Sequence, residues 1–185
     1  VLEEIIKPVS NRFFILEISS FQLEFIKDFK PDVAIYTNIS PDHLDRHKTM
    51  EEYISMKLRM IENMRDSDFI LYKSNDQILK NEFDSSKINT IPIDTFSSEN
   101  KYFIKGNYLY NLNEKIFNIK SFKLSGEHNY FNLIAAITCS SLFKIPFEKA
   151  KKAIKSFNYL EHRQEQVTIK NDICFINDSK ATNID

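Results

Sequence analysis

The order of apolar and polar positions in the first hundred residues predicts strands and helices in turn. Residues 12–18 are a continuous apolar run, typical of a strand buried on both faces of a parallel sheet, and residues 32–38 are predicted to be a second buried strand. Third and fourth strands are predicted at residues 68–72 and 88–93. Helices are predicted between them, at residues 19–29, 49–65 and 75–81. We expect Ser19 or Ser20 to cap the first helix, and Thr49 has Glu52 at the spacing of a capping box.

The second half of the chain has a different pattern. Short alternating segments predict an antiparallel meander at residues 101–104, 108–111 and 115–119. Two helices at residues 128–143 and 146–157 follow, and then a hairpin of residues 166–170 and 173–177. The predicted fold class is α/β: a mostly parallel sheet flanked by helices, with a small antiparallel β appendix.

Lys57 interrupts the amphipathic pattern of the helix predicted at residues 49–65. At about 100° per residue it falls at the centre of the apolar face, between Ile54 and Ile61. A lysine there can snorkel, with its stem on apolar surface and its amine in water. Alternatively, desolvation makes a buried amine neutral, so that it can act as a base, a nucleophile, or a carbamate that ligates Mg²⁺. Helix geometry favours neither reading.

Composition narrows the class of protein. The 185 residues are 42% hydrophobic, enough for one domain with a core, and the net charge of −1 gives no argument for a nucleic-acid partner. No apolar run approaches the roughly 20 residues of a membrane span. With no signal-peptide pattern, Cys139 and Cys174 are expected to be reduced thiols of a cytoplasmic protein.

Polar residues gather directly after three predicted strands. They are Glu17, the segment NISPDHLDRH at residues 38–47, and NDSKATN at residues 177–183. Ligands bind at the carboxyl ends of strands in open parallel sheets, so these clusters suggest one shared site. Each also has an ordinary explanation as a strand end or a solvated turn, and the His-x-Asp spacing of His43 and Asp45 is a weak metal motif.

Two further groups carry polar chemistry near the last helices. Asn129 and Asn132 lie one turn apart at a helix start, and amide side chains can read a nucleobase edge, although they are also ordinary in an Asn-rich chain. His162 and Arg163 stand beside the final hairpin, where an arginine could pair with a phosphate.

Together these stretches resemble the Mur ligase family. The motifs are EISSFQLE, NISPDHLDRH, the lysine of ISMKLRMIEN, LSGEHNYFN, EHRQE and NDSKATN, in the family's order. SSFQLE and NDSKATN are most similar to the members that add D-glutamate. The resemblance implies an ATP-dependent amide ligase of peptidoglycan synthesis, with a role in cell-wall biogenesis, cell shape and cell division. In such an enzyme UDP-N-acetylmuramoyl-L-alanine is activated as an acyl phosphate, which D-glutamate then attacks.

The resemblance also implies roles for individual residues. Two Mg²⁺ sites would involve Glu17 at one, and His43 with a carbamylated Lys57 at the other. The nucleotide would be bound by Asn129 and Asn132 at the adenine and by His162, Arg163 and Asp178 around the ribose and phosphates. Lys180 would face the reaction centre with His43 and Lys57, and Thr182 and Ser19 would face the substrates.

The resemblance covers only part of such an enzyme. It implies that residues 1–185 are a partial central ATP-binding domain, with the Gly-rich phosphate loop upstream and the uridine-nucleotide and D-glutamate domains outside the chain. The chain alone is therefore expected to be inactive, and the enzyme to be a monomer without nucleic-acid or membrane partners. One departure is Tyr159-Leu160-Glu161, which stands where the family usually has Gly-Leu-Pro.

Other readings stay open at this point. The chain could come from another Mur ligase or a folylpolyglutamate synthase, or it could be a folded fragment without function. A reading of a different class is a metal-dependent hydrolase that uses Glu17, Asp42, His43 and Asp45. A Gly-x-Gly-Lys-Thr loop upstream of residue 1 would favour the ligase.

Overall fold

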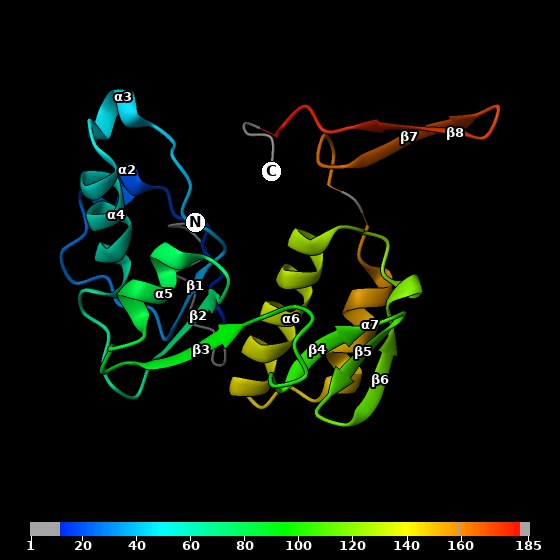
Figure 1. Ribbon diagram of the computed structural model, residues 1–185, viewed down its shortest axis with the longest axis horizontal. Helices are drawn as coiled ribbons and strands as arrows, with labels where there is room; N and C mark the ends of the chain where they lie inside the picture. Colours follow the sequence, from blue (N-terminus) through cyan, green and yellow to red (C-terminus); the bar gives the residue numbers. More distant parts are fainter. Residues whose placement is uncertain (1–11, 159, 182–185) are drawn as a thin grey trace. The chain divides into compact units, whose positions relative to one another are not determined.

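A computed structural model describes residues 12–158 and 160–181 of the chain (Figure 1). The described residues divide into two units. The helical unit comprises residues 12–30 and Pro41–Asn63, and the sheet unit comprises Pro31–Ser40 and residues 64–181. No helix in the described part of the chain combines the length and apolar character that a membrane span requires.

The helical unit contains three short α-helices and one 3₁₀ turn. They are α2 (Ser20–Leu23), α3 (Leu44–His47), α4 (Met50–Leu58) and η1 (Arg59–Ile61). Ser19 caps α2 and forms a complete capping box with Gln22, which confirms the first of the two predicted N-caps. Thr49 caps α4 as predicted, since its Oγ1 accepts a hydrogen bond from the Glu52 amide at 3.2 Å.

Two predictions for the helical unit were wrong. Residues 12–18 form no strand, and the Ile15 side chain is 95% exposed. A continuous apolar run indicates burial but does not supply the neighbouring strand that a ladder needs. The helix predicted at residues 19–29 ends at Leu23, and from Leu23 onward main-chain carbonyl oxygens accept hydrogen bonds from the side chains of Arg59 and Asn63 instead of from later amides of the helix.

The sheet unit begins with a three-stranded parallel sheet, as predicted. Its strands are β1 (Val33–Tyr36), β2 (Phe69–Lys73) and β3 (Asn89–Ile93), in the order β1-β2-β3. Helix α5 (Gln77–Phe83) packs against β2. The buried Phe83 ring lies 5.0 Å from the ring of Tyr36 and 5.3 Å from that of Tyr72, centroid to centroid, and so joins the helix to two strands.

Asp76 fixes both the start of α5 and the chain that leaves β1. Its Oδ1 accepts hydrogen bonds from the amides of Ile78 and Leu79 at 3.0 and 3.1 Å, and its Oδ2 accepts one from the Ile39 amide at 2.8 Å. We therefore expect Asp76→Ala to lower the free energy of unfolding by about 1–2 kcal/mol, the usual cost of losing an N-cap. Urea denaturation measures this loss, and the exposed Glu82→Ala on the same helix should change stability by less than about 0.5 kcal/mol.

An antiparallel sheet shares its core with the parallel one. It consists of β4 (Tyr102–Lys105), β5 (Tyr108–Asn111) and β6 (Glu114–Asn118), followed by the 3₁₀ turn η2 (Ile119–Ser121). Helix α6 (Glu127–Leu142) packs against both β3 and β4, and α7 (Phe147–Ser156) packs against α6. One continuous apolar cluster contains Leu71, Ile93, Ile104, Leu109, Phe117 and Ile134. The predicted appendix is thus part of the main core.

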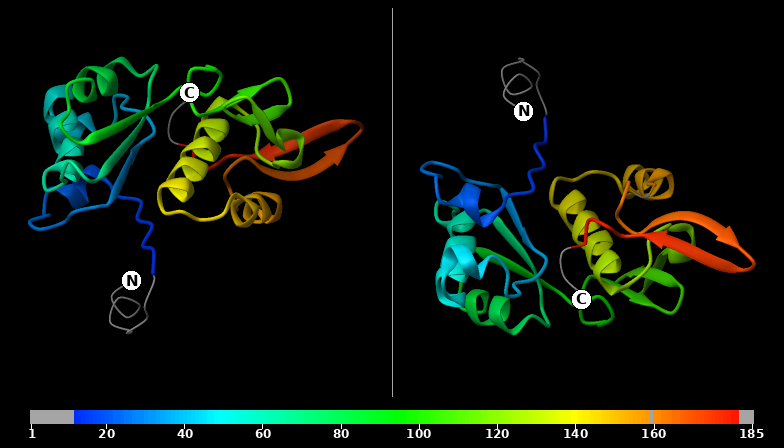
Figure 2. Two further views of the ribbon diagram at one scale, coloured as in Figure 1. Left: turned by 90° about the horizontal axis from the view of Figure 1, so that it is seen from below. Right: turned by 90° about the horizontal axis from the view of Figure 1, so that it is seen from above.

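The described chain ends in a hairpin of β7 (Glu165–Lys170) and β8 (Ile173–Asn177), which Figure 2 shows in orange and red. The predicted turn at Asn171 and Asp172 is confirmed, with φ values of 50° and 60°. These left-handed angles suit a two-residue hairpin turn. Cys174 in β8 is exposed, and Cys139 in α6 is half-buried; both are free thiols, and burial raises the pKa of Cys139.

Candidate functional site

A buried hydrogen bond joins α2 to α3 in the helical unit. The Ser20 hydroxyl and His47 Nε2 are 2.9 Å apart, and the two residues are only 2% and 5% exposed. The His47 ring stacks on Phe21 at 5.6 Å and contacts Tyr53 of α4 at 5.4 Å, centroid to centroid. His47 thus links all three α-helices of this unit. This contact was not predicted from the sequence: Ser20 was expected only as a possible helix cap, and the i+4 spacing from His43 to His47 was the one signal for His47.

His43 occupies the N-cap position of α3 with an exposed side chain. Its φ of 53° lies in the left-handed region, which is uncommon for a non-glycine residue. Asp42 Oδ1 accepts a hydrogen bond from the His43 amide at 2.9 Å, and Asp42 Oδ2 lies 3.4 Å from His43 Nε2. The ring of Phe21 is 4.9 Å away. The imidazole is therefore held in place beside a carboxylate and remains open to a ligand.

Lys57 is half-buried on α4, and its Nζ lies 5.3 Å from the centroid of the Tyr53 ring. An amine at this distance gains a cation–π contact while it is charged. The expected neighbours Ile54 and Ile61 are half-buried as well. Of the two alternatives left open by helix geometry, a fully buried amine is thus not observed. A partly accessible amine can still be reached by carbon dioxide.

The candidate metal ligands of the helical unit are individual residues and do not form a cluster. Within residues 12–158 and 160–181, no group of three or more His, Cys, Asp and Glu side chains could hold a metal ion. A hydrolase centre of Glu17, Asp42, His43 and Asp45 is therefore not assembled. Mg²⁺ that arrives with a nucleotide needs only one or two protein carboxylates, because phosphates and water fill the other positions. The exposed Glu17 fits a site of that kind.

In the sheet unit, the start of α6 is tied to the turn at residues 160–164. The Asn129 side chain is 8% exposed, and its Nδ2 donates to the Ser125 carbonyl at 2.7 Å and to Gln164 Oε1 at 2.9 Å. Gln164 Nε2 in turn donates to His128 Nε2 at 2.9 Å. The amide nitrogen of Asn129 is thus used within the protein. Asn132, one turn further along α6, is exposed and free to face a ligand.

The same turn is held to the segment that follows β8. The His162 carbonyl accepts a hydrogen bond from the Lys180 amide at 3.1 Å, and Asp178 Oδ1 accepts one from the Gln164 amide at 3.1 Å. His162 Nδ1 accepts a hydrogen bond from Asn177 Nδ2 at 2.9 Å. The structure thus brings His162, Asp178 and Lys180 together.

Arg163 projects from this turn. Its side chain is exposed, and its neighbours His162 and Gln164 have left-handed φ values of 66° and 46°. Such strain is typical of functional positions. Thr182 lies outside the described residues, as does Tyr159, the first residue of the departure at residues 159–161. Sequence reasoning missed His128 and Gln164, since their contacts join positions more than thirty residues apart.

The predicted site residues divide between the two units. Glu17, Ser19, His43 and Lys57 belong to the helical unit, and Asn129, Asn132, His162, Arg163, Asp178 and Lys180 belong to the sheet unit. Within each unit the predicted residues occupy neighbouring elements. That the two groups form one site remains a prediction.

Comparison with known proteins agrees with the resemblance seen in the motifs. The profile of the Mur ligase middle domain matches residues 4–140. UDP-N-acetylmuramoylalanine–D-glutamate ligase of Thermoanaerobacter sp. strain X514 is 39% identical and is matched over 98% of this chain and 41% of its own. The protein of that name in Caldanaerobacter subterraneus subsp. tengcongensis is 36% identical, over 95% of this chain and 39% of its own. The chain thus spans about two fifths of these curated relatives.

Solved structures support the fold. MurF of Acinetobacter baumannii superimposes with a TM-score of 0.65 at 16% identity, over 86% of this chain and 35% of its own. The UDP-N-acetylmuramate:L-alanyl-gamma-D-glutamyl-meso-diaminopimelate ligase of Neisseria meningitides gives a TM-score of 0.58 at 15% identity, over 71% of this chain and 41% of its own. The predicted α/β fold class, a parallel sheet flanked by helices with antiparallel strands added, is confirmed.

Proposed function

This chain belongs to the Mur ligase family, and we propose that it is the central ATP-binding part of an enzyme that joins D-glutamate to UDP-N-acetylmuramoyl-L-alanine in peptidoglycan synthesis. The observation that carries this proposal is the similarity to proteins named UDP-N-acetylmuramoylalanine–D-glutamate ligase, which are 36% and 39% identical over almost the whole chain. Because ATP and the uridine-nucleotide substrate are cytoplasmic, we place the enzyme in the cytoplasm. We also propose that it acts as a monomer, as the family resemblance implies.

The proposed reaction has two steps. The carboxylate of UDP-N-acetylmuramoyl-L-alanine attacks the γ-phosphate of ATP, and the products are an acyl phosphate and ADP. The amine of D-glutamate then attacks the acyl carbon and displaces inorganic phosphate. Both steps increase negative charge on phosphoryl oxygens, so cations placed around these oxygens lower both barriers.

The residues of the helical unit suit the phosphoryl end of this reaction. Two bound Mg²⁺ ions would supply charge stabilisation at the phosphates. Glu17 offers an exposed carboxylate for one of them, and Lys57 as a carbamate would offer oxygen ligands for the other. His43, held beside Asp42, would lie near the substrate carboxylate, and Ser19 would face the same substrate.

The residues of the sheet unit suit the nucleotide. Asn132 presents an exposed amide to the adenine, while Asn129 holds the turn at residues 160–164 in place. Arg163 projects from that turn, and its planar guanidinium can bind a phosphate through two parallel hydrogen bonds. We assign His162 and Asp178 to the surroundings of the ribose and phosphates, and Lys180 and Thr182 to the reaction centre and the amino-acid substrate.

The experiment that tests the proposed function uses the full-length protein. It should release ADP only when UDP-N-acetylmuramoyl-L-alanine, ATP, Mg²⁺ and D-glutamate are all present, and mass spectrometry should detect the new amide. L-lysine, meso-diaminopimelate or a folate with L-glutamate should not replace these substrates. Ligation with one of these alternatives, and not with D-glutamate, would assign the chain to another branch of the superfamily.

Arg163 provides a test of the nucleotide site. We expect Arg163→Ala in the full-length protein to weaken ATP binding by about 10- to 100-fold, because a hydrogen bond to a charged group is worth about 1.5–3 kcal/mol. Calorimetric titration with ATP and Mg²⁺ measures the change. The control is Arg65→Ala, which removes another exposed arginine of the same unit and should leave the affinity unchanged.

A further inference from the structure

Glu24, the first residue after α2, contacts both α3 and the start of η1, which directly follows α4. Its carboxylate Oε2 accepts a hydrogen bond from Arg46 Nη2 of α3 at 2.7 Å. Its carbonyl oxygen accepts another from Arg59 Nη1, at the start of η1, at 2.8 Å. The Glu24 side chain is 17% exposed, so this ion pair is partly shielded from water.

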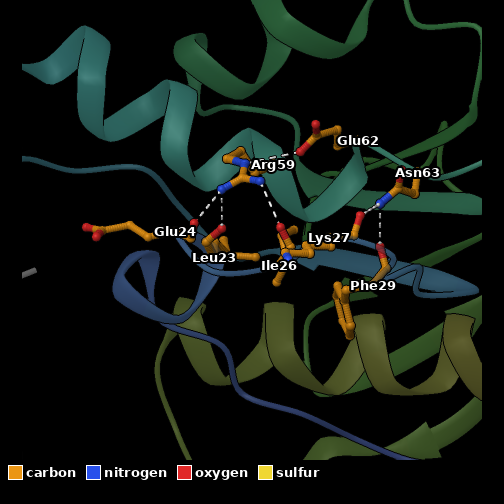
Figure 3. A network of polar contacts seen from close by, with 8 residues as sticks. All are labelled: Leu23, Glu24, Ile26, Lys27, Phe29, Arg59, Glu62 and Asn63. Atoms are coloured by element: carbon orange, nitrogen blue, oxygen red, sulfur yellow. Dashed lines mark hydrogen bonds and ion pairs between the residues drawn. The ribbon is translucent and has the colours of Figure 1, made fainter.

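Arg59 and Asn63 extend this connection along the chain that follows α2, as Figure 3 shows. Besides the carbonyl of Glu24, the Arg59 guanidinium binds the carbonyls of Leu23 at 2.8 Å and Ile26 at 3.0 Å. Asn63 Nδ2 donates to the carbonyls of Lys27 at 2.8 Å and Phe29 at 3.1 Å. Two side chains thus satisfy five main-chain oxygens of an irregular segment.

The elements that meet at Glu24 are those that carry the proposed phosphoryl-transfer residues. Helix α2 directly follows Glu17 and Ser19, α3 begins after His43, and Lys57 lies two residues before Arg59. These residues come from separate elements of the unit. Their spacing therefore depends on the contacts that hold α2, α3 and α4 together.

We propose that Glu24, Arg46 and Arg59 are positioning residues that hold the segments bearing Glu17, His43 and Lys57 at the spacing required to bind magnesium with the nucleotide. This inference rests on the proposed function. A planar guanidinium can hold three carbonyls in fixed directions, which the single ammonium of a lysine cannot do. None of the three residues needs to touch a substrate.

We expect loss of the ion pair between Glu24 and Arg46 to lower the stability of the fold only slightly. A large effect on magnesium binding would therefore indicate a positioning role and not simple support of the fold. Arg46 is 57% exposed, and ion pairs with such exposure contribute about 0–1 kcal/mol. A displacement of about 1 Å at reacting groups, by contrast, can cost about 100-fold in rate. Loss of the pair should therefore change the magnesium dependence far more than the melting temperature.

The test uses full-length Glu24→Gln and Arg46→Met, with ligation measured over a range of Mg²⁺ concentrations. We expect the Mg²⁺ concentration for half-maximal rate to rise about tenfold or more in each variant, the usual effect of losing a group that orients a metal ligand. The double variant Glu24→Arg with Arg46→Glu keeps the main-chain bond to Arg59 and restores an opposite-charge pair, so it should recover most of this loss. Glu62→Gln serves as the matched control. It neutralises the exposed carboxylate of Glu62, whose Oε2 lies 3.1 Å from Arg59 Nε.

A second measurement does not depend on ligation. Mn²⁺ binding to each full-length protein in the presence of ADP, followed by electron paramagnetic resonance, should weaken by the same factor in Glu24→Gln and Arg46→Met and be unchanged in Glu62→Gln. Equal Mn²⁺ affinity in all variants, or a charge-swapped variant as weak as the single variants, would overturn the inference. If the wild type binds Mn²⁺ with ADP but does not ligate D-glutamate, the proposed substrate is wrong, and the Mn²⁺ comparison still decides the role of Glu24.

Discussion

Lys57→Ala should lower the ligation rate of the full-length enzyme by about a thousandfold or more. This is the upper range for removal of one group that stabilises charge in a transition state. The physical reason is that alanine removes both the amine and any carbamate formed on it, and with them the proposed oxygen ligands for one Mg²⁺. Initial rates of D-glutamate-dependent ADP release measure the loss. Lys80→Ala, at an exposed position of α5, should keep the wild-type rate.

Chemical rescue distinguishes a carbamate from a charged lysine at this position. Acetate is small and carries a carboxylate, so it should restore part of the activity of Lys57→Ala in a concentration-dependent way. Lys57→Arg keeps a cation that can lie over the Tyr53 ring but cannot become this carbamate, and it should be as inactive as Lys57→Ala. Normal activity of Lys57→Ala would show that the lysine has no part in the reaction.

Phe83→Ala should cause the largest loss of stability, about 3–5 kcal/mol in the free energy of unfolding. Phe83 is 1% exposed, and its ring contacts Tyr36 of β1 and Tyr72 of β2, so alanine leaves a cavity between α5 and the parallel sheet. Since a whole domain is stable by only about 5–15 kcal/mol, this change should remove a large part of the stability of the isolated chain.

Urea denaturation followed by circular dichroism measures the effect of Phe83→Ala. The matched control is Phe96→Ala, which truncates a phenylalanine of the same unit that is 54% exposed. The control should lose less than about 1 kcal/mol. Similar losses in the two variants would mean that the interface between α5 and the sheet contributes little to stability.

Much of the sheet unit could be predicted from the sequence because its signals are local. The two-residue turn at Asn171 and Asp172, the parallel strands and the start of α6 were each placed to within one or two residues. Period-2 and continuous apolar patterns, helix caps and turn residues act over short distances, and in this unit they agree with the tertiary packing.

The helical unit shows what local patterns omit. The apolar run at residues 12–18 predicted a buried strand, but no strand forms and most of its apolar side chains are exposed, since a partner strand is not encoded in the run itself. The hydrogen bond between Ser20 and His47 and the ion pair between Glu24 and Arg46 join positions more than twenty residues apart. Motif resemblance predicted roles for Lys57 and His43, but it carried no information on these contacts between distant positions.

The five carbonyl groups bound by Arg59 and Asn63 also affect which substitutions and length changes the segment after α2 can tolerate. A main-chain oxygen is the same for every amino acid, so the contacts of residues 23, 24, 26, 27 and 29 do not depend on which side chains stand there. Exposed positions such as Phe25 and Asp28 should accept many replacements in a saturation library. The number of residues between α2 and β1 should not change, because one insertion or deletion would move every later oxygen away from its donor.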